Sequence, residues 1–186
     1  MINIISAIGS IGTFIMALFY FISVSIQLYQ MKMSFLPALG FNQILMTRDG
    51  EKLKLRNTSV HQTEDAQWGE DYLKLFNLGA GAAKQIKIEV YLDEENVLQS
   101  KYVSILPSKE SYLLPINKDV FDELDRTIEN NGYESNLQIK IQYQHNVSRK
   151  VQTLYLQGHI DSFNRYDESS VYELQFIQPE NQNTKA

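Results

Sequence analysis

The N-terminal run from Ile2 to Leu28 constrains the fold most, because its 27 residues include no Asp, Glu, Lys, Arg or His. A helix of this length, rising about 1.5 Å per residue, would be roughly 40 Å long, and the hydrocarbon core of a bilayer is about 30 Å thick. The alternative is a core helix of a soluble domain, but about 18 consecutive apolar residues already exceed what such a helix normally contains. The run therefore predicts a transmembrane helix, with residues 1–30 as the anchor.

A cleaved secretory signal is the competing interpretation of this run. No basic residue precedes it, it is too long for a signal h-region, and no small-x-small cleavage site follows it. The chain also has no cysteine, which excludes a lipoprotein anchor, disulfides, thiolate zinc sites and a cysteine nucleophile. We therefore expect an uncleaved, single-pass anchor.

The charges are distributed unevenly along the chain. Residues 1–56 carry five basic and two acidic side chains, whereas the remainder carries 12 basic and 20 acidic ones. Positive charge thus follows the apolar run, and by the positive-inside tendency the C-terminal domain is expected in the cytoplasm, at the cell membrane. The acidic remainder argues against nucleic acid as a partner, since phosphates require a concentrated basic face.

Small and hydroxyl residues recur along the apolar run at Ser6, Gly9 and Thr13. Spacings of three and four place them on one stripe of a helix, and such stripes let helix backbones approach closely in lipid. These residues are the predicted helix–helix contact, either with a second copy in a homo-oligomer or with a partner helix. The alternative is that small residues are simply common in transmembrane helices.

The periodicity changes after the apolar run from helical to alternating. Residues 31–41, which include Pro37, form the expected juxtamembrane connector and first strand, residues 42–178 a β domain, and residues 179–186 a mobile tail. Asp49-Gly50 is the expected turn of a hairpin, because both residues tolerate the positive φ of a type I′ turn. Alternation predicts further strands over Tyr72–Asn77, Gln85–Leu92, Val97–Ile105, Ser111–Ile116, Leu137–Tyr143, Val151–Tyr155 and Val171–Ile177.

One segment interrupts the strands, because residues 119–130 show helical spacing, with Asp119 as the expected N-cap and Gly132 beyond the end. The last long hairpin should turn near His145 and Arg149. The predicted fold class is therefore mainly β: one transmembrane helix followed by an antiparallel β-sandwich with one short helix. A closed β-barrel is the alternative.

A glycine-rich corner separates two of these strands, where residues 73–86 read Leu-Lys-Leu-Phe-Asn-Leu-Gly-Ala-Gly-Ala-Ala-Lys-Gln-Ile. The glycines allow positive φ, and the alanines allow two backbones to lie close together. No third glycine follows at nucleotide-loop spacing, no Lys-Ser or Lys-Thr follows, and the next segment is a strand. A phosphate-binding loop is therefore not expected.

The anchor, the early Pro37 and this corner together resemble small bacterial single-span membrane proteins, mostly uncharacterised, whose immunoglobulin-like sandwich carries a strand-Asn-x-Gly-x-Gly-x-Ala-strand corner. This chain has Ala82 where proline is more usual in that family. The resemblance implies an immunoglobulin-like fold, and it transfers neither an activity nor a site residue.

Few residues are arranged for chemistry. His61, His145 and His159 are scattered, no His-Glu-x-x-His pair or Gly-x-Ser-x-Gly elbow occurs, and the acidic clusters lack calcium-loop spacing. Catalytic residues, metal ligands and cofactor-binding residues are therefore not expected. The only tryptophan, Trp68, lies in a polar loop expected from Asn57 to Asp71, where it would either cover one end of the core or anchor a partner.

Two functions follow from these features. The first is a non-enzymatic interaction module, in which a cytoplasmic β-sandwich held at the membrane binds a protein partner. The second is a membrane effector or regulator, whose transmembrane helix oligomerises when the β domain senses a ligand or partner. An enzyme is the third and least supported class.

Overall fold

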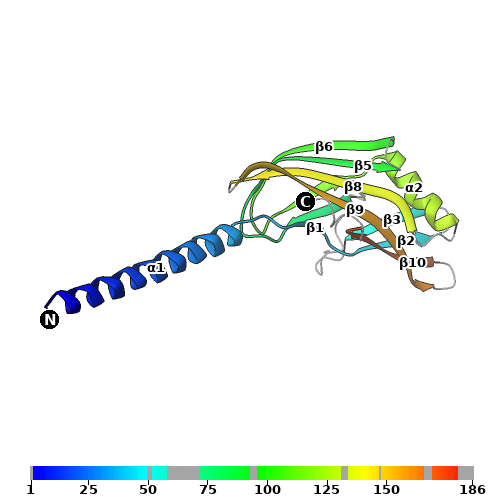
Figure 1. The fold of residues 1–186 in the computed structure, drawn as a ribbon. Coiled ribbons are helices and arrows are strands. Elements are labelled where there is room, and N and C mark those ends of the chain that lie inside the picture. The colour runs from blue at the N-terminus through cyan, green and yellow to red at the C-terminus, as the bar shows by residue number, and fades with distance from the viewer. Residues whose placement is uncertain are drawn as a thin grey trace.

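The computed structural model describes residues 2–49, 52–57, 72–92, 96–130, 134–146, 148–165 and 169–179. Helix α1 (Ile2–Ser34) projects away from a β domain that contains all the other described elements (Figure 1). Its segment Ile8–Ser34 is long and apolar enough to cross a membrane, and its most apolar stretch is not buried against any of the described residues. The helix continues four residues past the expected anchor boundary at residue 30, and Pro37, which disfavours helix in the residue before it, follows its end.

The β domain contains two antiparallel sheets. The smaller sheet has the order β1-β4-β7, and the larger has the order β3-β2-β10-β9-β8-β5-β6. The strands are β1 (Leu39–Phe41), β2 (Ile44–Asp49), β3 (Lys52–Asn57), β4 (Tyr72–Asn77), β5 (Ala83–Leu92), β6 (Asn96–Leu106), β7 (Ser111–Pro115), β8 (Glu134–His145), β9 (Ser148–Arg165) and β10 (Ser169–Ile177).

The seven-stranded sheet curls into a half-barrel (Figure 1). One buried hydrophobic cluster joins both sheets, because Leu73 and Leu75 of β4 belong to it together with Ile139 and Ile141 of β8. The predicted mainly β, antiparallel architecture is therefore confirmed. The layers are unequal, since the larger sheet wraps around the core and the smaller one contributes only three strands.

The alternating segments form the strands that were predicted from them, but β9 is much longer than the predicted Val151–Tyr155, since it runs from Ser148 to Arg165. In β4 every second residue is buried, as expected for a strand with one face in the core. The hairpin of β2 and β3 is also confirmed, but Asp49 pairs with Lys52. Asp49 therefore belongs to strand β2 and not to the turn as predicted, and Gly50 lies outside the described residues.

The short helix is confirmed as α2 (Lys118–Glu129), which lies at the end of the β domain away from α1 (Figure 1). Its buried residues Val120, Leu124 and Ile128 follow helical spacing and join the core. The predicted cap was wrong, because the side chain of Asn117 accepts the hydrogen bond from the Val120 N–H at 3.0 Å. Asp119 lies in the first turn, where its charge favours the helix dipole.

Candidate functional site

The junction between α1 and the β domain is the most extensively bonded polar site that the structure describes. The chain leaves α1 through Phe35 and Leu36, buries Pro37, and enters the smaller sheet at β1. The corner that follows β4 lies against this exit segment: the Leu78 N–H donates to Ala38 O at 2.8 Å, and the Gly81 N–H donates to Leu36 O at 3.4 Å. We call residues 35–38 together with the corner 77–81 the exit clasp.

Asn77 is the centre of the exit clasp, and its side chain is fully buried. Its Oδ1 accepts from the backbone N–H groups of Ala38 and Gly79, each at 3.2 Å. Its Nδ2 lies within hydrogen-bonding distance of the carbonyl oxygens of Gly81 at 2.7 Å, Pro107 at 3.0 Å and Leu106 at 3.2 Å. One amide side chain therefore connects the segment that leaves α1, the glycine corner and the turn after β6.

Two glycines allow the corner to approach the exit segment this closely. A Cβ atom at Gly81 would lie 1.8 Å from the carbonyl oxygen of Phe35, and one at Gly79 would lie 2.3 Å from Leu36 O. Both distances are far below van der Waals contact, and both obstacles are backbone atoms. The sequence requires glycine at these positions because the helix exit occupies the space of a side chain.

The turn after β6 completes the clasp. The Ser108 hydroxyl donates to Gly79 O at 2.6 Å, and the Lys109 N–H donates to Asn77 O at 2.9 Å. Lys109 adopts a left-handed backbone conformation with φ of 61°. Since three segments bond to one another around Pro37, the end of α1 is held in a defined position relative to the sheets.

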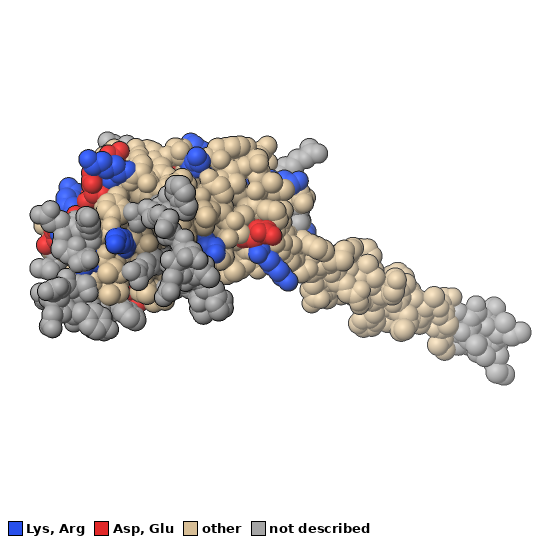
Figure 2. All heavy atoms as spheres, turned by 180° about the vertical axis from the view of Figure 1, so that it is seen from behind, with Lys and Arg blue, Asp and Glu red and all other residues tan. Residues whose placement is uncertain are grey.

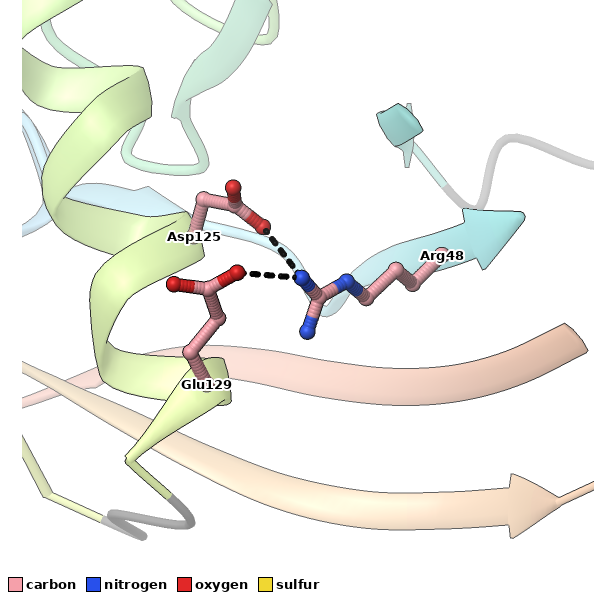
Figure 3. Close-up of polar contacts among 3 residues, drawn as sticks. All are labelled: Arg48, Asp125 and Glu129. Carbon is pink, nitrogen blue, oxygen red and sulfur yellow. Dashed lines mark hydrogen bonds and ion pairs between the residues drawn. The ribbon is translucent and has the colours of Figure 1, made fainter. Parts of the chain in front are cut away.

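A second polar group lies at the opposite end of the domain, where Arg48 of β2 points toward two carboxylates of α2 (Figure 3). Its Nη2 lies 2.6 Å from Glu129 Oε1 and 3.7 Å from Asp125 Oδ1. The Arg48 Nε and the Asp125 Oδ1 are buried and have no hydrogen-bond partner in the structure. This bridge fastens α2 to the larger sheet, and its partly exposed ion pairs are expected to contribute less than about 1 kcal/mol each.

An open groove lies between α2 and the start of β6. It has a volume of about 450 Å³ and is lined by Asn96, Val97, Leu98, Asp119, Asp122, Glu123 and Arg126. Arg126 pairs with the nearly buried Glu123, and Val97 is half exposed. The groove therefore combines an apolar edge with a mainly acidic wall, and it can accept an extended or basic segment.

The structure places the sequence-predicted helix contact on the exposed surface of α1. The Thr13 hydroxyl donates to Gly9 O at 2.9 Å, within its own helix, and a Cβ at Gly9 would meet nothing within 4 Å. The side chain of Ser6 lies outside the described residues, as does all of Trp68. A contact through Gly9 and Thr13 stays a prediction.

The titratable side chains of the described residues do not form a metal centre. Groups of three or more His, Asp or Glu side chains that could hold an ion do not occur among these residues. His145 is buried, and His159 lies 3.3 Å from Asp161 on β9. Burial raises the pKa of Tyr143 above its ordinary value of 10.0, since the ionised phenolate would lose hydration.

No family model, curated protein or solved structure matches this chain. Its function must therefore be inferred from its own residues. Sequence reasoning found the glycine corner but missed its partners, because Asn77 is 39 residues from Ala38 and 29 from Leu106. It also missed the bridge from Arg48 to α2. The Asn-x-Gly-x-Gly pattern was the only local signal of the clasp.

Proposed function

We propose that this chain is a membrane-anchored, non-enzymatic interaction module, which spans the cell membrane once through α1 and presents its β domain to a protein partner in the cytoplasm. The exit clasp is the observation that carries the proposal. A flexible linker would be enough to keep a domain near a membrane, whereas here a buried Asn77 and two close-packed glycines fix the domain to the helix end. Fixed geometry is useful when the domain must meet a partner in one orientation.

The groove between α2 and β6 is the proposed binding surface for that partner. β6 is an outer strand of the seven-stranded sheet, but at the groove Leu98 O already accepts from Asn117 Nδ2 at 2.8 Å, so a partner would bind there through side chains rather than as an added strand. Asp119 and Asp122 are exposed on the facing helix and favour a partner with basic side chains. The groove lies far from α1, where a partner can reach it without contacting the bilayer (Figure 1).

Site-specific photo-crosslinking in membranes tests the proposal. A photoreactive amino acid at Val97, in the groove, is expected to give one discrete protein adduct, whereas the same group at the exposed Gln175 of β10 should not. Adding Asp122→Lys should weaken the adduct by reversing the charge of the groove wall. The proposal is wrong if position 97 captures no protein while the chain is folded and membrane-bound.

The proposed topology needs its own measurement. Cytoplasmic placement rests on the excess of basic residues after the apolar run. A cytoplasmic reporter fused to the C-terminus should be active, and alkaline phosphatase at the same place inactive. The opposite pattern would invert the topology, and a mature N-terminus beyond residue 28 would show that the apolar run is cleaved.

A membrane effector or regulator is the second candidate function, favoured by the open space around Gly9 and Gly12 on α1. In this case the transmembrane helices associate, and the clasp transmits a change in the β domain to them. Overproduction distinguishes the two functions, because an effector should depolarise or permeabilise cells when its domain is triggered. An interaction module should leave the membrane potential unchanged.

We also propose that the β domain belongs with the immunoglobulin-like sandwiches of small bacterial single-span proteins. The Asn77-x-Gly79-x-Gly81-x-Ala83 corner supports this assignment, since it joins a strand of one sheet to a strand of the other. An experimental structure of a second chain with the same corner tests it. A different strand order around that corner would argue against a common fold.

A further inference from the structure

The end of the β domain at which α1 attaches differs in charge from the opposite end. The start of β5, the end of β6 and the end of β8 meet there, because Ala83 pairs with both Leu106 and His145. Exposed lysines lie at or near this end, at the last turn of α1, on β5, in the turn after β6 and on β9: Lys32, Lys84, Lys109 and Lys150. Helix α2, at the far end, carries five carboxylates and two basic residues.

Large apolar side chains are also exposed at this end. Leu78, at the tip of the glycine corner, is 76% exposed, and Phe35, directly after α1, is 53% exposed. Ile105 pairs with Lys84 and is about half exposed as well. Apolar groups flanked by basic side chains are the composition of surfaces that lie in a bilayer interface.

The exit clasp determines how far this end lies from the membrane. The Gly81 N–H bonds to Leu36 O, two residues after the end of α1. A helix rises about 1.5 Å per residue, so the corner lies within roughly one helical turn of the end of α1. Figure 2 shows α1 as a tan rod over most of its described length, with both blue and red side chains where it meets the domain; Lys32 lies in the last turn of the helix.

We propose that this end of the β domain is a second membrane contact, which docks on anionic phospholipid headgroups of the leaflet through which α1 leaves the bilayer. The inference rests on the proposed span and adds what the domain does beside it. Lys84, Lys109 and Lys150 bind the headgroups, while Leu78 and Phe35 enter the interfacial layer. Glu110 is an exposed carboxylate in the turn that also contains Lys109. The exposed lysines outnumber it, so the described residues at this end carry net positive charge.

Charge complementarity favours a lipid surface over a second protein here. A basic residue near an anionic bilayer surface strengthens binding by roughly fivefold, and several such residues act together. The remaining domain is acidic and would be repelled by the same surface, which turns the groove beside α2 away from the membrane. Docking would thus hold the proposed partner site toward the solvent.

The full-length chain, reconstituted in vesicles, provides the test. The chain has no cysteine, so Ala80→Cys places a single environment-sensitive fluorophore on the exposed corner, and Asp122→Cys places one on α2. With phosphatidylcholine vesicles containing about a third phosphatidylserine, the probe at residue 80 should shift to the blue and be quenched by brominated lipid. The probe at residue 122 should keep the emission wavelength of a water-exposed fluorophore in all vesicles.

Charge reversal separates docking from simple proximity. The triple variant Lys84→Glu, Lys109→Glu and Lys150→Glu should weaken docking by at least about a hundredfold, at roughly fivefold per lysine, and abolish the quenching difference between anionic and zwitterionic vesicles. The matched control reverses three exposed lysines elsewhere, Lys54, Lys101 and Lys118, and should retain it. High salt should also reduce the signal.

Two results would overturn the inference: equal quenching at residue 80 in zwitterionic and anionic vesicles, or an unchanged signal in the triple variant. Resistance to alkaline extraction measures the span separately. A chain that resists extraction but shows no dependence on anionic lipid lacks the docking surface and keeps the anchor. A chain that is extracted lacks the anchor itself.

Discussion

Replacing Asn77 is the most direct test of the exit clasp. The side chain has five polar contacts, but its Nδ2 group has only two hydrogens to share among three carbonyl oxygens, so about four full hydrogen bonds are formed. A typical hydrogen bond contributes about 1 kcal/mol net. Because some of the freed backbone groups can be hydrated, Asn77→Ala should lower the free energy of unfolding by about 2 to 4 kcal/mol, out of a total of about 5 to 15 kcal/mol.

Asn77→Asp sharpens the prediction, because it retains the shape of the side chain and replaces the donor with an oxygen. At neutral pH a carboxylate oxygen would face the three carbonyl oxygens of Gly81, Leu106 and Pro107, so the loss of stability should exceed that of Asn77→Ala. The folded state favours the protonated acid, which can donate. The protonated acid has one donor hydrogen where Asn77 has two, so the difference from the parent should be smallest, about one hydrogen bond, below about pH 4 and should grow as pH rises above that value.

Urea unfolding of the full-length chain in detergent micelles, followed by circular dichroism, measures these differences. Helix α1 stays in the micelle and contributes a constant circular dichroism signal, so the change in signal on unfolding reports the β domain. Asn146→Ala, at an exposed turn, is the control and should change the unfolding free energy by less than about 0.5 kcal/mol. The reasoning is refuted if Asn77→Ala behaves like this control, or if the Asp variant shows no dependence on pH relative to the parent.

Three further predictions concern other parts of the chain. Gly81→Ala should destabilise the domain by about 2 kcal/mol or more, because its Cβ would lie 1.8 Å from a backbone oxygen, whereas Gly40→Ala, with open space, should be tolerated in the same urea assay. Gly9→Leu should reduce the association of α1 with a second transmembrane helix, measured by cross-linking in membranes and by a two-hybrid assay for transmembrane helices, while Ile15→Leu should not. Equal association in both variants would mean that α1 serves only as an anchor. The free energy of unfolding should fall as pH rises above 10.0, because burial keeps Tyr143 protonated in the folded state while the unfolded chain ionises. Tyr143→Phe should flatten this part of the pH profile. An unchanged slope would show that Tyr143 is not the group responsible.

The sequence by itself determined the features that depend on short-range periodicity. An uncharged run of 27 residues is a helix with no hydrophilic face, whatever follows it. Alternation in Tyr72–Asn77 and helical spacing at Phe121, Leu124 and Ile128 each specify an element, because the period of the apolar side chains differs between strand and helix. These signals lie within a few residues of one another and can be read without the fold.

Only the tertiary structure decided which distant groups meet. Asn77 was part of a visible corner, but its partners at Ala38 and Leu106 depend on how β1, β4 and β6 are placed. Arg48 and Glu129 are 81 residues apart and meet because α2 packs at the end of the curled sheet. The cap of α2 likewise moved to Asn117, whose side chain also reaches Leu98 O on β6. Local periodicity specifies the direction of each side chain within its own element, whereas its partners are set by the packing of elements far apart in sequence.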